Sequence, residues 1–182
     1  MFVDEIPVLL SVASDKRWCA FVPCEATSFW KMKFIADNML GRLAKWLRIM
    51  GYDTAYSSSI SDGELLQRAA AEKRIILTRN HRLVTRAASC KLILVRYDNI
   101  WEQLRQVVRE LNLNLREHVM TRCSVCNCKL VSVDRESIEG KVADYIFQTQ
   151  QEFSRCPQCG RIYWKGSHYQ RIRERLCWIR GE

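Results

Sequence analysis

Short apolar runs alternate with amphipathic stretches four times between residues 33 and 113. The apolar runs lie at 33–36, 54–56, 74–78 and 91–95, and the amphipathic stretches lie at 39–50, 61–73, 80–89 and 99–113. In the first amphipathic stretch the apolar positions fall at i, i+3, i+4 and i+7, counted from Leu40, which is one face of a helix. Short strands joined by helices predict a parallel sheet covered on both faces, with right-handed crossovers. The pattern therefore predicts an α/β fold.

The pattern changes in the last part of the chain. Residues 116–182 contain short strand-like runs, paired cysteines and a single helical stretch near 135–151. They end in a basic helix, which is expected over 167–176 with Ser167 as its N-cap. We therefore expect a small cysteine-bearing module with a basic C-terminal helix.

The first 31 residues fit neither part. The first predicted strand begins directly after Met32, and the residues before it lack the alternation of strand and helix. We therefore expect residues 1–31 to be a dispensable extension. Residues 32–115 then form the α/β domain, and residues 116–182 form the cysteine module.

Two Cys-x2-Cys pairs in the module are the strongest chemical signal in the sequence. Cys123 and Cys126 form the first pair, and Cys156 and Cys159 form the second. Four thiolates at this spacing are typical of a structural zinc site, in which sulfur fills all four tetrahedral positions. The alternatives are a redox pair or ordinary buried cysteines, and Cys128 lies close enough to replace Cys126 as a ligand. Because the total of nine cysteines is odd, complete disulfide pairing is impossible and zinc is the better interpretation.

Polar side chains follow each of the predicted strands. Asp37 ends the first strand, and Asp62 and Glu64 open the helix after the second. Asn80 follows the third strand and Asp98 the fourth. The carboxyl ends of parallel strands form the edge where α/β proteins bind ligands, and oxygen ligands there would hold Mg²⁺ or Mn²⁺. The alternatives are helix-capping roles for Asp62, Glu64 and Asn80, and a turn at Asp98.

The chain is basic, with a formal net charge of +9. This charge favours a polyanionic partner, either nucleic acid or an anionic membrane surface. No apolar run approaches the length of about 18 residues that a membrane span requires. The opening, Met1 to Glu5, is acidic where a secretory signal would be basic. We therefore expect a cytoplasmic protein.

Basic residues gather in runs, some of them beside aromatic residues. The residues expected to contact nucleic acid are Arg42, Lys45, Arg79, Arg82, Trp164, Lys165, His168, Arg171 and Arg173. Arg48 is expected to continue the exposed stripe that Arg42 and Lys45 form on the first helix. Cations interleaved with aromatic rings suit single-stranded nucleic acid, because phosphates pair with the cations and bases stack on the rings. A solvated helix face is the alternative for each run taken singly.

Several of these stretches together resemble one known family. The sequence from Phe34 to Arg48, then Gly51-Tyr52-Asp53-Thr54, Ser61-Asp62 and Leu77-Thr78-Arg79 resemble the PIN-like ribonuclease domain at the C-terminus of the Mut-seven exonucleases, which also occurs as a free-standing prokaryotic protein. The ending from Arg155 to His168 is similar to the zinc ribbon of that family. The resemblance covers about residues 33–176. It implies a PIN-like fold fused to a zinc ribbon, and metal-dependent cleavage of RNA.

The resemblance also implies roles for the acids. Asp37 corresponds to the first metal-binding acid, Asp62 or Glu64 to the second, and Asp98 to a further one. The family usually has an acid where this chain has Asn80, and an amide brings no charge, so we expect weaker binding of the catalytic metal. The alternatives to a ribonuclease are a nucleic-acid-binding module with a degraded active site and a zinc-stabilised protein-interaction adaptor.

Overall fold

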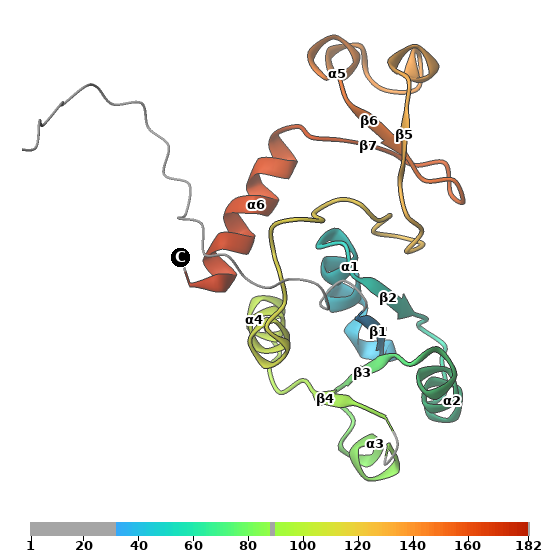
Figure 1. Cartoon of the computed structure of the whole chain (residues 1–182), viewed down its shortest axis with the longest axis vertical. Helices are drawn as coiled ribbons and strands as arrows, with labels where there is room; N and C mark the ends of the chain where they lie inside the picture. The colour runs from blue at the N-terminus through green and yellow to red at the C-terminus, as the bar shows by residue number, and fades with distance from the viewer. Residues whose placement is uncertain (1–31, 88–89, 182) are drawn as a thin grey trace, which may run out of the picture.

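The α/β domain is built on a four-stranded parallel sheet in a computed structural model that describes residues 32–87 and 90–181 (Figure 1). The strand order is β2-β1-β3-β4, so β2 and β4 are the edge strands. The strands are β1 (Lys33–Ala36), β2 (Asp53–Tyr56), β3 (Ile75–Thr78) and β4 (Leu92–Leu94). The expected α/β architecture is confirmed, and the proposed extension at 1–31 lies outside the described residues.

Helices cover both faces of this sheet, as the non-alternating strands predicted. The domain contains the 3-10 helix η2 (Asn38–Leu40) and the helices α1 (Gly41–Ile49), α2 (Asp62–Glu72), α3 (His81–Arg86) and α4 (Ile100–Leu111). Side chains of β1 alternate between two cores: Phe34 packs with residues of α1 and α4, whereas Ile35 packs with residues of α2 and α3. The predicted capping box opens α2, where Ser61 and Glu64 bond to each other's backbone amides.

The cysteine module contains a three-stranded antiparallel sheet of order β5-β6-β7. The strands are β5 (Val131–Val133), β6 (Phe153–Arg155) and β7 (Ile162–Trp164). The single helix expected near 135–151 is wrong: two short elements, η3 (Arg135–Ile138) and α5 (Asp144–Thr149), lie there instead. Between them Gly140 adopts a left-handed conformation (φ +68°), which is incompatible with one continuous helix over this stretch.

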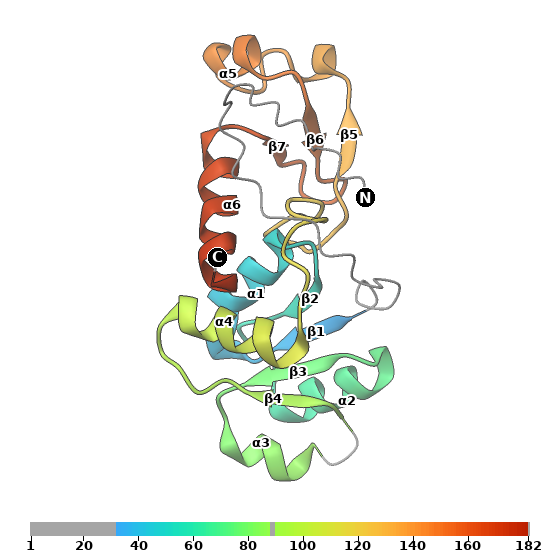
Figure 2. The same cartoon turned by 60° about the vertical axis from the view of Figure 1, so that its left-hand side comes forward.

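The last helix, α6 (Ser167–Arg180), returns to the α/β domain and packs on α4 (Figure 2). It continues four residues beyond the predicted end, since Leu176 and Ile179 are buried in the same core as α4. Gly166 is the N-cap, so the role predicted for Ser167 is wrong. None of the helices in the described part of the chain has the length and apolarity needed to cross a membrane.

Candidate functional site

The four cysteines of the two Cys-x2-Cys pairs meet at one point. Their sulfur atoms all lie within 4.8 Å of one another. The Sγ of Cys126 is 3.3 Å from that of Cys123 and 3.2 Å from that of Cys156, and Cys123 and Cys159 are 3.6 Å apart. Zinc–sulfur bonds of about 2.3 Å in a tetrahedron place the sulfurs roughly 3.8 Å apart. The donor set therefore fits one structural zinc ion.

The electrostatics of the cluster also suit a cation. Burial disfavours the Cys123 thiolate, but hydrogen bonds from the Cys126 and Val125 amides and from the Tyr163 hydroxyl outweigh it and lower the pKa of Cys123 to about 6. Burial and the neighbouring thiols raise the pKa of Cys126. Sulfurs this close cannot all be thiolates without a cation to offset their repulsion. A bound metal ion removes that conflict.

Cys128 does not join this cluster. Its Sγ lies 2.9 Å from Oε1 of Gln158, and the four-cysteine group does not include it. Its backbone carbonyl instead accepts a hydrogen bond of 2.8 Å from the Cys123 amide. The geometry therefore favours Cys126 over Cys128 as the second ligand of the first pair.

Asp37 stands at the carboxyl end of the central strand β1. Its side chain is 5 % exposed, with Oδ2 accepting a hydrogen bond of 2.6 Å from Thr78 Oγ1 and Oδ1 accepting one of 2.6 Å from the Asn38 amide. The Asp37 amide donates to the Leu77 carbonyl of β3, which fixes the residue at the sheet edge. Asp37 is thus a buried carboxylate that makes no ion pair with any cation in the described part of the chain, and this is the most distinctive feature of the site.

Asp62 and Asn80 lie next to each other on the same edge. The Asn80 amide nitrogen donates to Asp62 Oδ2 over 3.4 Å, and Arg86 makes an ion pair of 3.3 Å with the same oxygen. The Asn80 backbone amide donates to Thr78 Oγ1 over 2.9 Å, so Thr78 connects this pair to Asp37. Asn80 also caps α3, because its Oδ1 accepts from the Arg82 amide over 3.0 Å.

The other two acids have different partners. The carboxylate of Glu64 accepts hydrogen bonds from both the amide and the hydroxyl of Ser61, at 2.9 and 2.8 Å. Asp98 is 88 % exposed and pairs with Arg79. Within residues 32–87 and 90–181, the cysteine cluster is the only group of three or more His, Cys, Asp or Glu side chains close enough to share an ion. The acids thus line one edge, but they do not converge as the sequence had suggested.

The basic residues expected on α1 divide into two groups. Arg42 and Lys45 are exposed, as predicted. Arg48 is only 7 % exposed, so its assignment to the exposed stripe is wrong. Its guanidinium donates to the carbonyls of Thr54 and Val125 at 2.8 and 2.6 Å, which replaces water as its partner.

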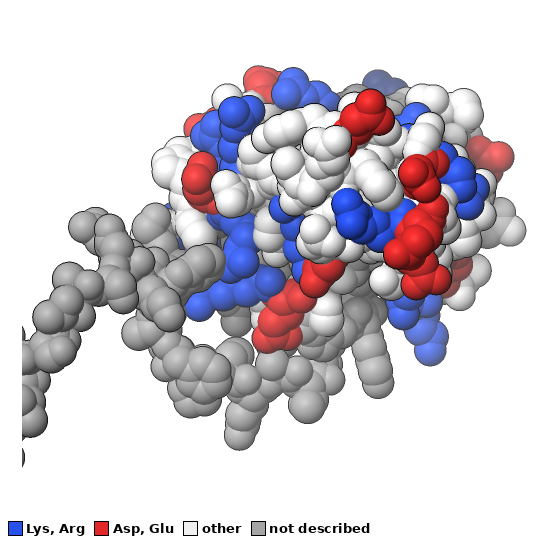
Figure 3. Space-filling view, turned by 90° about the horizontal axis from the view of Figure 1, so that it is seen from above, with Lys and Arg blue, Asp and Glu red and all other residues white. Residues whose placement is uncertain are grey.

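The basic residues of the module and of α3 differ in their exposure and in their contacts. Arg82, Arg171 and His168 are exposed, whereas Lys165 forms an ion pair of 2.8 Å with Glu152. The Arg173 guanidinium lies 5.9 Å from the Tyr169 ring, and the Trp164 and His168 rings meet edge to face at 5.6 Å. At the far end of the module, acidic and basic side chains are interspersed and do not form one basic patch (Figure 3).

Two residues near the acidic edge were missed from the sequence. Thr78 connects Asp37 to Asn80, and it was visible only as part of the Leu77-Thr78-Arg79 motif. Tyr97 is 46 % exposed beside Asp98, and the buried Gln103 side chain holds this loop by donating to the Tyr97 carbonyl over 2.9 Å. An aromatic residue three positions after a strand end is the signal that could have identified it.

One comparison with known proteins gives a match. A sequence model described as the Mut7-C RNAse domain matches residues 32–176, which includes both the acidic edge and the four cysteines. No curated protein matches the chain.

Proposed function

The chain belongs to the Mut7-C RNAse domain family, and on that premise we propose that it is a metal-dependent ribonuclease acting on single-stranded RNA. The observation that carries this proposal is Asp37, a carboxylate that is 5 % exposed at the end of the central strand. Ionised groups are rarely buried without a partner of opposite charge unless they bind a cation. Asp37 is therefore the residue that we assign to the catalytic metal.

Asp62 is the second acid that we assign to Mg²⁺ or Mn²⁺. It lies on the same edge as Asp37 and is connected to it through Asn80 and Thr78. Oxygen donors of this kind suit small divalent ions, which keep several waters when bound. Such an ion supplies an activated water and positive charge for the leaving oxygen of a phosphodiester.

The chain's own cations contribute to substrate binding in this proposal. Arg79 and Arg86 pair with Asp98 and Asp62 in the structure, so each lies beside the acidic edge. When RNA binds, these guanidiniums can exchange their carboxylate partners for phosphate oxygens. Tyr97 offers a ring on which an unpaired base can stack, a contact worth about 1–3 kcal/mol per base.

Glu64 and Asp98 have weaker support as catalytic residues. The Glu64 carboxylate is used by the capping box of α2, and Asp98 is almost fully exposed. We therefore rank both behind Asp37 and Asp62. They remain proposed members of the site, which an added metal ion could recruit by side-chain rotation.

Asn80 favours a second function, a nucleic-acid-binding module with a degraded active site. Its amide oxygen already caps α3 and its amide nitrogen donates to Asp62, so the side chain brings no negative charge to a metal. A site with one charge fewer binds Mg²⁺ less tightly. On this alternative the Arg residues of the edge retain RNA, but no bond is cleaved.

Cleavage of end-labelled single-stranded RNA separates these functions. The native protein should give products only with Mg²⁺ or Mn²⁺, and Asp37→Asn, which removes the charge and keeps the side-chain size and one acceptor oxygen, should abolish them. Asp144→Ala, which removes an exposed acid of the module, is the matched control and should cleave normally. Retention of RNA without any cleavage would identify a binding module, and neither retention nor cleavage would identify an adaptor.

Asn80→Asp extends the same assay. The added carboxylate can still cap α3 and places a negative charge beside Asp62. If the edge binds metal, cleavage should begin at lower Mg²⁺ or Mn²⁺ concentration than in the native protein. An inactive and less stable variant at saturating metal would support the degraded site, because an extra charge among acids is then only repulsive.

A further inference from the structure

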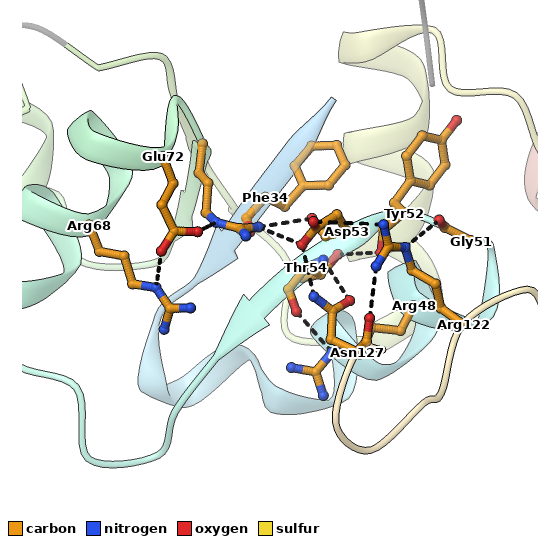
Figure 4. Close-up of polar contacts among 11 residues, drawn as sticks. Phe34, Arg48, Gly51, Tyr52, Asp53, Thr54, Arg68, Glu72, Arg122 and Asn127 are labelled. Carbon is orange, nitrogen blue, oxygen red and sulfur yellow. Dashed lines mark hydrogen bonds and ion pairs between the residues drawn. The ribbon is translucent and has the colours of Figure 1, made fainter. Parts of the chain in front are cut away.

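Arg122 and Asn127, which directly flank the first cysteine pair, lie beside the edge strand β2 of the parallel sheet (Figure 4). The backbone amide of Thr54 in β2 donates to Asn127 Oδ1 over 3.0 Å, and the Thr54 carbonyl accepts from Arg48 Nε over 2.8 Å. Thr54 is completely buried (0 % exposed), so water cannot satisfy these groups. Asn127 and Arg48 therefore take the place of the missing neighbouring strand.

The turn that forms the cysteine site determines where Asn127 points. Asn127 follows Cys126 just as Gly160 follows Cys159, and both adopt left-handed conformations, with φ of +68° and +71°. Their amides make equivalent hydrogen bonds of 3.0 Å, to the carbonyl of the first cysteine of each pair. Asn is one of the few residues other than glycine that tolerates this conformation. The same turn that brings two sulfurs together thus directs the Asn127 amide at β2.

Two arginines hold this turn on the α/β domain. Arg48, at the end of α1, donates to the Val125 carbonyl over 2.6 Å, within the turn between the two cysteines. Arg122 donates to the Gly51 carbonyl over 3.1 Å and to the Asn127 carbonyl over 2.8 Å, so it bridges the turn after α1 and the cysteine turn. The contact between the cysteine turn and the α/β domain therefore includes backbone carbonyls of both parts.

Asp53 extends the contact into the centre of the sheet. Its carboxylate accepts from Asn127 Nδ2 over 2.8 Å and from Arg74 over 2.7 Å, and Arg122 lies 3.7 Å away. Arg74 also donates to the Phe34 carbonyl of β1 over 3.1 Å. Burial opposes the charge on Asp53, but these hydrogen bonds and cations hold the pKa of its carboxyl below the usual value. The Asn127 amide thus has a partner for both its oxygen and its nitrogen.

We propose that zinc binding by the four cysteines controls the β2 edge of the α/β domain, with Asn127 as the coupling residue. Loss of the ion removes the bonds that hold the four sulfurs together, so the turn opens and Asn127 no longer meets Thr54. Coupling of this kind is reciprocal, so the formed edge also favours zinc binding. The proposal concerns the zinc site and does not depend on ribonuclease activity.

Hydrogen exchange of individual amides in the full-length protein tests the coupling. In the zinc-loaded protein the Thr54 amide should be protected, and after zinc removal by a chelator it should exchange at least about tenfold faster. The Val95 amide, which donates to the Thr78 carbonyl over 2.7 Å, is the internal reference and should be unaffected. Re-addition of zinc ions should restore protection at Thr54. Equal exchange of Thr54 with and without zinc would overturn the proposal.

Two variants separate the amide of Asn127 from the shape of the turn. Asn127→Gly preserves the left-handed conformation and removes the side chain, so Thr54 should exchange about tenfold faster even with zinc bound. Gly160→Asn makes the reverse change in the second turn, where an added Cβ would be 3.7 Å from an Arg155 side chain, and it should leave Thr54 protected. Unchanged exchange in Asn127→Gly would contradict the proposal. If that variant does not fold, the zinc titration of the native protein decides the question alone.

Discussion

The two edge strands of the parallel sheet are both completed by an amide side chain, but the two amides come from different parts of the molecule. At β4, Gln106 donates to the Leu94 carbonyl over 2.8 Å and accepts from the Arg96 amide over 3.0 Å. At β2, Asn127 and Arg48 serve Thr54. In each case side chains satisfy backbone groups that a further strand would otherwise pair.

The positions of the two amides depend on different forces. Gln106 lies in the middle of α4 and is only 9 % exposed, so the packing of that helix on the sheet fixes it. Asn127 lies in a short turn whose geometry depends on the cysteine site. One edge is therefore completed by the α/β domain alone, whereas the other needs Asn127 of the cysteine module in addition to Arg48 of α1. A side-chain amide thus completes both edges, but Gln106 needs no bound ion for this, whereas Asn127 needs the turn that the cysteine site forms.

Cys156→Ser should have the largest effect on this comparison. Cys156 belongs to the second cysteine pair and none of its described contacts reaches β2, so any change at that edge must pass through the metal site. The variant should release zinc and unfold the module, because a structural zinc site supplies on the order of 10 kcal/mol of folding free energy.

The helices of the α/β domain should survive in Cys156→Ser, as measured by circular dichroism. Hydrogen exchange should show a deprotected β2 edge and an intact β4 edge. Elemental analysis that finds no zinc in native protein purified without chelator would refute the premise.

Gln106→Leu should give the next largest effect, at the opposite edge. The substitution leaves the Leu94 carbonyl and the Arg96 amide without their partner, and a buried unsatisfied group costs about 1–3 kcal/mol. We expect a loss of about 2 kcal/mol in the free energy of unfolding.

The loss in Gln106→Leu should be the same in zinc-loaded and in chelated protein, as measured by denaturant unfolding under both conditions. A loss that changes with zinc would show that the β4 edge is not independent of the module. Glu102→Gln, an exposed change one turn earlier in α4, is the control and should cost no more than about 1 kcal/mol, the contribution of a charge at a helix N-terminus.

Asp53→Asn should weaken the β2 edge by a smaller amount that depends on pH. The pKa of Asp53 is lowered from 3.8, so its carboxylate stabilises the folded protein above that value and this contribution is lost as the pH falls through the folded pKa. At pH 7 the variant should lose about 1.5 kcal/mol, the lower end for hydrogen bonds to a charged group.

As the pH falls below 3.8, the melting temperatures of native protein and Asp53→Asn should begin to converge, and they should meet below the folded pKa. Melting curves of both proteins between about pH 3 and pH 7 check this. A constant difference over the whole range would mean that the charge of Asp53 does not support the edge.

The alternation of short apolar runs with amphipathic stretches predicted the parallel sheet and its covering helices, but it gave no information about contacts between distant segments. Arg48 lies at i+8 from Leu40, on the buried face of α1, yet its charge argued for exposure. The carbonyl that makes burial possible belongs to Val125, 77 residues later in the chain. Only the folded structure brings such partners together.

The polar residues that complete the sheet edges were harder to identify from the sequence. Gln103 and Gln106 occupy positions on the apolar face of α4, and a polar residue at a core position is a signal of a specific partner. Asn127 occupies the place where the second turn has glycine, which predicts its conformation but not its contact with Thr54. For the acids, strand ends predicted the shared edge, whereas the ion pairs of Asp62 and Asp98 depend on side-chain positions that spacing does not encode.

Cys128→Ser should have the smallest effect of these substitutions, and it tests whether Cys128 belongs to the zinc ligands. Cys128 directly follows Asn127, and the sequence left it open as a ligand in place of Cys126. In the structure its sulfur contacts Gln158, and its backbone carbonyl, like its backbone amide, supports the cysteine turn. Because serine preserves that carbonyl, zinc content should stay unchanged and the free energy of unfolding should change by no more than about 0.5 kcal/mol. Thr54 should also remain protected from exchange. Loss of zinc in Cys128→Ser, together with its retention in Cys126→Ser, would shift the ligand set by two residues and would require a different turn beside β2.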